Sequence, residues 1–131
     1  MPLWKKLYGT VWLAFFSCVL IPRWILPAVG VPLHILVGLA MLVLTQRNMR
    51  QLAALPVPDR LKRISRVTAG FAIFQIICGL ALGAAMQFAP GVAVVAAVLR
   101  GTHIVCALTI LAQAASVATA YDMWEEKEFS S

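Results

Sequence analysis

The residues best suited to chemistry in this chain are two histidines, His34 and His103, its only imidazoles. Each lies near the start of a long apolar stretch, where an imidazole is costly unless it serves a ligand, a proton path or a cofactor. Neutral imidazoles on facing helices of a bundle are suitable axial ligands for a six-coordinate heme iron. We therefore predict that His34 and His103 are a pair of heme ligands, provided that the elements carrying them bring them together.

The apolar composition of the chain predicts an integral membrane protein. Hydrophobic residues make up 62% and charged residues 12% of the 131 residues, and the mean hydropathy of +0.89 lies outside the usual range of soluble domains. A spanning helix needs about 20 mostly apolar residues. Four segments meet or approach this length: 7–22, 29–45, 67–87 and 100–121. The sequence thus predicts an all-α fold, a membrane four-helix bundle in which residues 1–131 form one domain.

The first and last of these segments depend on how their flanking residues are interpreted. The first is short, and we expect the stems of Lys6 and Arg23 to extend its reach. It has no convincing small-x-small cleavage site, so we expect it to be retained rather than removed as a signal peptide. The last begins either at Gly91 or, if Arg100 marks the membrane interface, close to Gly101, and we favour the later start.

Positive charge is concentrated on one side of the expected membrane. Two lysines precede the first segment and six basic residues occupy the link 46–66, whereas only Arg23 and Arg100 lie on the other side. The positive-inside rule places both termini, this link and the acidic tail 122–131 in the cytoplasm. We expect the protein to lie in the plasma (inner) membrane of a prokaryote. Topology therefore accounts for the net charge of +6 without a nucleic-acid partner, and the basic link attracts anionic lipid headgroups.

The two histidines are expected at the same depth in the bilayer. Both of their segments enter from the outer side, so His34 and His103 reach a similar level near the outer leaflet. Gly38 follows the first histidine by four residues and Ala107 follows the second by four. Because residues four apart are neighbours on a helix surface, the small side chains leave room beside each imidazole for the edge of a flat macrocycle.

Two arginines at the outer boundary complete the expected heme site. Arg23 and Arg100 are suited to pair with propionate carboxylates, although either is equally well explained as an interface anchor. The expected cofactor-binding residues are His34, His103, Arg23, Arg100, Gly38 and Ala107, with the two histidines as ligands of the iron of heme b. A polar packing pair, a proton site, or a different pigment or metal remain the alternatives for the histidines.

A glutamine and two glycines follow one another at four-residue spacing in the third segment. Gln75, Gly79 and Gly83 share one helix face, and small residues at this spacing let membrane helices approach closely. We expect the glycines to serve packing and Gln75 to hydrogen-bond across helices.

None of the thiols or hydroxyls is expected to do chemistry. Cys18, Cys78 and Cys106 fall in three different segments without a CxxC pair, which predicts buried small side chains and neither a disulfide nor a metal site. Ser17 and the other serines are not expected to have a base nearby. The sequence also lacks a glycine-rich phosphate loop and an HExxH motif, so no residue is assigned a catalytic role.

The order of these features resembles one four-helix half of the heme A synthase family. The resemblance covers about residues 31–121 and is carried by His34, the basic link, the QIICG run containing Gln75 and Gly79, and His103. In that family each half is a four-helix bundle with paired histidines on its second and fourth helices, and two halves serve heme O as substrate and heme b as cofactor. The resemblance implies that His34 and His103 are paired axial ligands.

The chain departs from this family where catalysis is concerned. Gly30 stands where the catalytic half commonly has a glutamate, and Ile35 stands where an arginine often follows the histidine. The cysteine pair of the outer loop is missing, and no carboxylate occurs within residues 1–58. The resemblance therefore supports heme binding better than it supports oxidation of a heme methyl group.

Three functions remain open on sequence grounds. The first is a small b-type cytochrome that transfers electrons or handles heme. The second is a heme A synthase-type oxidoreductase acting with a partner that supplies the missing acid. The third is a cofactor-free structural subunit. The chain is expected to work alone, as a homo-oligomer, or as a subunit of a respiratory or assembly complex.

Overall fold

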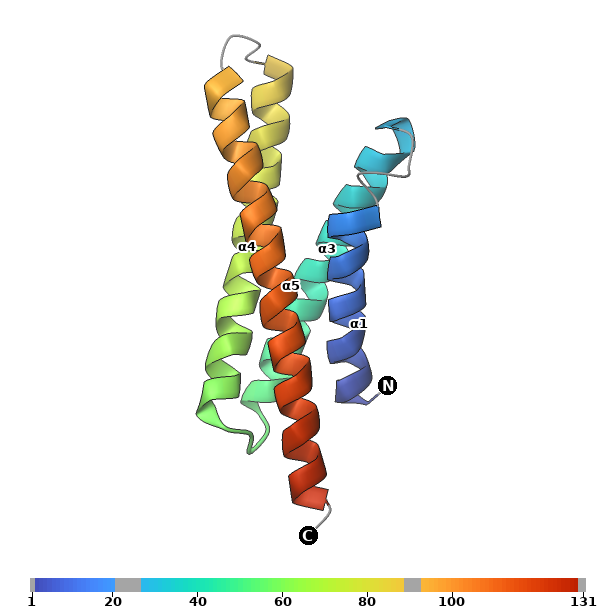
Figure 1. The fold of residues 1–131 in the computed structure, drawn as a ribbon, viewed down its shortest axis with the longest axis vertical. Coiled ribbons are helices and arrows are strands. Elements are labelled where there is room, and N and C mark those ends of the chain that lie inside the picture. Colours follow the sequence, from blue (N-terminus) through green and yellow to red (C-terminus); the bar gives the residue numbers. More distant parts are fainter. Residues whose placement is uncertain (1, 21–26, 89–92, 130–131) are drawn as a thin grey trace.

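The computed structural model describes residues 2–20, 27–88 and 93–129, which are almost entirely helical (Figure 1). Helix α1 spans Leu3–Phe15 and continues into the π-helical turn η1, Phe16–Leu20. The longer helices are α3, Pro27–Ala53, α4, Asp59–Phe88, and α5, Ala93–Phe129. The predicted all-α fold with four helices is confirmed.

Three of these helices are long and apolar enough to cross a membrane. They are Val29–Ala53, Asp59–Gln87 and Ala93–Glu128, within α3, α4 and α5. Helix α1, with 13 residues, is shorter than the roughly 20 residues that a span requires. The length and composition of the three long helices support a membrane protein with several spans.

The long helices extend well beyond the expected apolar segments. Helix α3 continues to Ala53 and α4 begins at Asp59, so helix covers most of the polar stretch 46–66 and only residues 54–58 are non-helical. Helix α5 begins at Ala93, before the membrane entry expected near Gly101, and includes most of the acidic tail. The added residues are rich in good helix formers such as Ala, Leu, Gln, Arg, Lys and Glu. Helix α3 ends before the link 54–58 because this link contains two prolines, which cannot continue a preceding helix.

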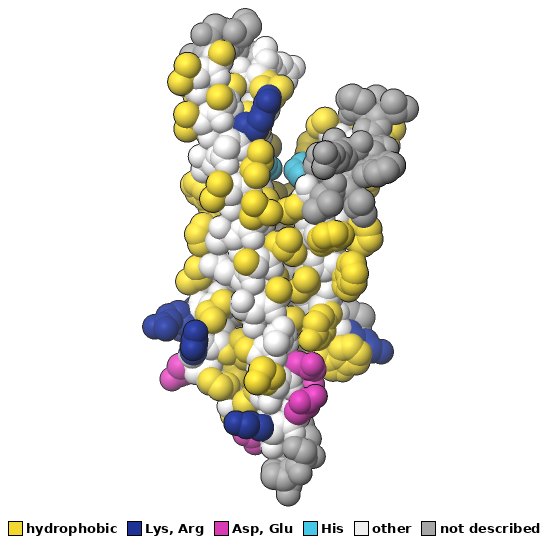
Figure 2. Space-filling view, viewed as in Figure 1, with side chains coloured by type: hydrophobic (Ala, Val, Ile, Leu, Met, Phe, Trp, Pro, Cys, Tyr) yellow, Lys and Arg dark blue, Asp and Glu magenta, His cyan; other side chains and the backbone are white. Residues whose placement is uncertain are grey.

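The four helices form a ring in which each packs against two neighbours, in the cyclic order α1, α3, α4, α5. Both ends of the chain and the link 54–58 lie at one end of the molecule (Figure 1). Toward the other end, α4 and α5 stay together and diverge from α3. Figure 2 shows most of the charged side chains gathered at the first end, and a hollow between the helices at the second.

The core consists of two apolar clusters with a polar layer between them. One cluster lies toward the termini and comprises Leu7, Leu52, Val57, Leu61, Val117, Ala118 and Tyr121. The other lies nearer the middle and comprises Ala14, Met41, Ala72, Cys106 and Ile110. All the buried polar residues that the structure describes belong to the polar layer, and they are Thr10, Thr45, Asn48, Ser65 and Thr68.

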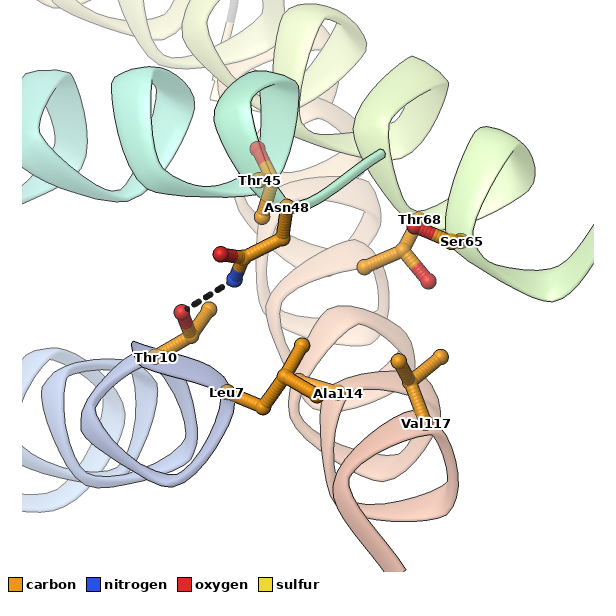
Figure 3. A pocket seen from close by; sticks show the side chains of 8 residues that line it. All are labelled: Leu7, Thr10, Thr45, Asn48, Ser65, Thr68, Ala114 and Val117. Carbon is orange, nitrogen blue, oxygen red and sulfur yellow. Dashed lines mark hydrogen bonds between the residues drawn. The ribbon is translucent and has the colours of Figure 1, made fainter. Parts of the chain in front are cut away.

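The polar layer surrounds a cavity of ≈ 20 Å³ (Figure 3). Asn48 Nδ2 donates a hydrogen bond of 2.9 Å to Thr10 Oγ1, which joins α3 to α1. The hydroxyls of Thr10, Thr45 and Thr68 donate to backbone carbonyls four residues earlier in their own helices. These hydroxyls are satisfied locally, whereas Asn48 Oδ1 is buried without a hydrogen bond among the described residues.

Replacing Leu52 by alanine is expected to lower the free energy of unfolding by about 2–5 kcal/mol, because large-to-small core substitutions lose burial and leave a cavity. Leu52 is fully buried, at 0% exposure, whereas Leu36 on the same helix is 64% exposed. Denaturant unfolding in detergent, with Leu36→Ala as the matched control, checks this. Equal losses from the two substitutions would contradict the packing described above.

Candidate functional site: a histidine pair on α3 and α5

The structure brings His34 on α3 and His103 on α5 together. Their ring centroids lie 5.9 Å apart and the ring planes are inclined by 57°. Two imidazoles bound to opposite sides of one metal ion at about 2 Å place their ring centroids roughly 6 Å apart. The observed separation therefore suits one metal ion between the rings.

The histidine pair lies at the base of the hollow between the diverging helices. In Figure 2 both histidine side chains are visible there, between the upper part of α4 and α5 on one side and α3 on the other. Each imidazole is half-buried. The hollow therefore leaves one side of the histidine pair open (Figure 2).

The His34 ring is held from the π-helical turn η1. Ser17 Oγ lies 3.4 Å from His34 Nδ1, so this serine does have an imidazole beside it, contrary to the sequence analysis. A π-turn shifts the direction of the side chains that follow α1, and helical spacing alone does not predict such a turn. A hydrogen bond at one ring nitrogen orients a metal-binding histidine and leaves its other nitrogen for the metal.

The Ser17–His34 pair lacks the third group of a hydrolytic site. A nucleophilic serine needs a base that is oriented in turn by another polar group, usually a carboxylate. The five Asp and Glu residues of the chain are Asp59 and four residues within 122–128, at the end of the molecule that carries the termini (Figure 2). The pair is therefore better suited to orienting His34 than to acyl transfer.

The His103 ring is held by two residues of α4. Gln75 Nε2 lies 3.1 Å from His103 Nε2, which confirms the prediction that Gln75 bonds across helices. A Cβ atom added at Gly79 would lie 3.0 Å from His103 Cε1, so this glycine makes room for the imidazole ring itself. At Gly83, one turn further along, an added Cβ would meet nothing within 4 Å. The two glycines, which look equivalent in sequence, therefore have different surroundings.

Two polar atoms beside the histidine pair have no partner. Gln75 Oε1 and His103 Nδ1 are buried without a hydrogen bond among the described residues. Buried polar atoms are nearly always satisfied in native proteins, so an unsatisfied group calls for an explanation such as an absent ligand.

The remaining predicted site residues have different surroundings. Arg100 is exposed, with Nη2 4.0 Å from Met86 Sδ, and it is three residues from His103, so the two are neighbours on the surface of α5. An added Cβ at Gly38 would lie 3.5 Å from Ile76 Cδ1, so the space beside Gly38 adjoins an α4 side chain. Ala107 is half-buried. Arg23 lies outside the described residues.

The histidine pair does not belong to a larger cluster of metal-ligating side chains among the described residues. Across the described ranges 2–20, 27–88 and 93–129, no group of three or more His, Cys, Asp or Glu side chains is placed to hold a metal. A porphyrin supplies four nitrogens of its own and needs only two axial ligands, so the histidine pair fits heme. The thiols of Cys78 and Cys106 are buried. The Cys78 thiol donates a hydrogen bond to the backbone carbonyl of Leu99, and the Cys106 thiol donates one to that of Phe71. Cys18 is half-buried.

No protein-family model, no curated protein and no solved structure matches this chain.

Proposed function

We propose that this protein binds one heme b between His34 and His103 and serves electron transfer or heme handling in a membrane. The observation that carries the proposal is the 5.9 Å separation of the two imidazole centroids, which suits a shared iron. When bound, the heme would supply one-electron chemistry at its iron. The chain's own residues supply two neutral imidazoles, an apolar surround and a positive charge near the propionates.

The surroundings of the pair support a heme more than a bare metal ion. The hollow between the diverging helices (Figure 2) offers an open side for a macrocycle. Arg100, on the same face of α5 as His103, is available to the propionates because it makes no ion pair among the described residues. Guanidinium groups bind carboxylates well, so we assign propionate binding to Arg100, and also to Arg23 from the sequence.

The distribution of charge supports the proposed orientation. The basic residues near both termini and the link 54–58 are gathered at one end of the helices (Figure 2). By the positive-inside rule this end faces the cytoplasm, and the histidine pair lies toward the outer leaflet. The membrane proposed is the plasma membrane of a prokaryote.

The heme A synthase-type activity is the second candidate, and it requires a partner. Every carboxylate of the chain lies far from the histidine pair along the helices, so the chain itself offers no carboxylate acid or base at the heme edge. A second copy, or a subunit of a respiratory or assembly complex, would have to supply it. An assay for conversion of heme O to heme A separates this activity from electron transfer.

The third candidate is a cofactor-free structural subunit, favoured by the bond between Gln75 and His103. Hydrogen bonds of this type between membrane helices are worth about 0.6–2 kcal/mol, enough for a purely structural role. The reduced-minus-oxidised absorbance spectrum of the purified protein decides between heme binding and a cofactor-free structural role. A sharp low-spin b-type spectrum supports the heme proposal. No heme absorbance after expression with ample heme would overturn it in favour of the structural subunit.

A further inference from the structure

We propose that the outer face of α4, near the link 54–58, binds one molecule of an anionic phospholipid. The headgroup phosphate pairs with Arg63 and Arg66, and one acyl chain lies in an apolar groove that passes over Gly70. The site is separate from the histidine pair, which lies toward the other end of the helices (Figure 2).

The groove is open and apolar, and it runs along α4. It has a volume of ≈ 340 Å³ and is lined by Val67, Gly70, Phe71 and Phe74. The side chains of Val67 and Phe74 are 44% and 48% exposed. A Cβ added at Gly70 would meet nothing within 4 Å, so this glycine forms the floor of the groove. From Val67 to Phe74 the helix rises by about 10 Å, which is long enough for several carbons of an acyl chain.

Two arginines continue this face of α4 toward the link. Residues three or four apart are neighbours on a helix surface, so Arg63 and Arg66 lie beside each other. By the same spacing Arg66 lies one turn from Gly70. Both arginines are exposed, and neither makes a hydrogen bond or an ion pair among the described residues. Two guanidinium groups on one face are suited to a phosphate group, which accepts bidentate hydrogen bonds.

The change from polar to apolar sequence falls between the arginines and the groove. Arg66 is the last charged residue before the uncharged run 67–88. The arginines therefore lie at the level of the headgroups and the groove faces the hydrocarbon. A free phosphate ion would contact the arginines and leave the groove empty, whereas a phospholipid has both a negative phosphate and an apolar chain. This complementarity selects an anionic phospholipid.

The basic residues of α3 provide a comparison at the same end of the molecule. Arg47 and Arg50 are also exposed, but the groove is lined by residues of α4 alone. Arg47 and Arg50 therefore attract anionic headgroups only through their charge. They separate a general electrostatic attraction from binding at a defined site.

The first test is a titration of the full-length protein with phosphatidylglycerol in a neutral detergent, followed by native mass spectrometry. Wild type is expected to retain one phosphatidylglycerol molecule in preference to phosphatidylcholine, which has no net charge. Combining Arg63→Gln with Arg66→Gln is expected to weaken this binding roughly 30-fold, because two basic residues no longer contact the headgroup. Combining Arg47→Gln with Arg50→Gln removes the same charge and is expected to leave the binding unchanged. Equal losses from the two double variants would overturn the inference.

The second test fills the groove while every arginine is kept. The side chain added by Gly70→Leu projects into the groove, since a Cβ there meets nothing within 4 Å, and leucine favours a helix more than glycine does. The variant is therefore expected to fold, and to bind phosphatidylglycerol about threefold more weakly because the acyl chain loses its contacts. Gly83→Leu is the matched control, because its Cβ also meets nothing within 4 Å and Gly83 does not line the groove.

The groove test stands even where the double arginine variant does not fold, because it changes no charge. Phosphatidylglycerol binding by Gly70→Leu that equals wild type would exclude the groove as the acyl-chain site. A competition with glycerophosphoglycerol, the same headgroup without acyl chains, is expected to leave the lipid bound. Displacement of the lipid by this soluble headgroup at equal concentration would show that the arginines bind phosphate alone, and would overturn the inference.

Discussion

Replacing either His34 or His103 by alanine is expected to abolish the sharp low-spin heme spectrum of this protein. The two ring centroids lie 5.9 Å apart, and the chain has no third histidine to substitute. Loss of one axial ligand leaves the iron without the strong-field pair that a low-spin state requires. Absorbance spectra of the two purified variants, compared with wild type at equal protein concentration, measure the effect.

Ser17→Ala is the control for these histidine variants. Ser17 Oγ contacts His34 at Nδ1, at 3.4 Å. Its removal is therefore expected to keep the low-spin spectrum and to weaken heme affinity. Hydrogen-bond partners of metal-bound histidines typically contribute about 10–100-fold to metal affinity. Alanine variants of His34 and His103 that both keep the wild-type spectrum would exclude the pair as axial ligands.

Replacing Gly79 by leucine is expected to eliminate heme binding, although Gly79 itself contacts no iron. A Cβ at this position already lies 3.0 Å from His103 Cε1, and the further carbons of leucine would occupy the space of the ring. The imidazole must then move, and its observed separation from His34 is lost. The heme content of purified Gly79→Leu protein, measured per polypeptide, checks this.

Gly83→Leu is the matched control on the same helix. An added Cβ at Gly83 meets nothing within 4 Å, so this variant is expected to bind heme as wild type does. Leucine has a higher helix propensity than glycine by nearly 1 kcal/mol, so both variants keep α4 helical, as circular dichroism will show. Equal heme content in the two variants would contradict the close packing of His103 against Gly79.

Parts of the candidate site were open to prediction because helix geometry is regular. The position of His34 and His103 near the same ends of their segments follows from counting residues, since each residue adds 1.5 Å along a helix. The bond from Gln75 to another helix follows from the cost of an unpaired amide in an apolar segment. In contrast, the helix ends within the polar stretch 46–66 were not predicted, because hydropathy marks where a segment becomes polar and not where a helix ends.

Ser17 and the special place of Gly79 were not predictable in the same way. Ser17 reaches His34 from a π-turn, which changes the register of side chains by an amount that no apolar periodicity reveals. Gly79 and Gly83 have the same spacing and the same residue type, and only the position of the His103 ring on the opposing helix distinguishes them.

By itself, the sequence determined that this protein is built of helices, that these helices are apolar enough for a membrane, and that its basic residues gather at one end, although it predicted four spanning segments where the structure has three helices long and apolar enough. These properties depend on composition and on distance along each helix. Only the tertiary structure decided that the two imidazoles lie close together, with Ser17 beside one and Gln75 beside the other. The physical reason is that a membrane helix is apolar on its lipid face and its packing face alike, so its rotation about its own axis is set by packing against its neighbours.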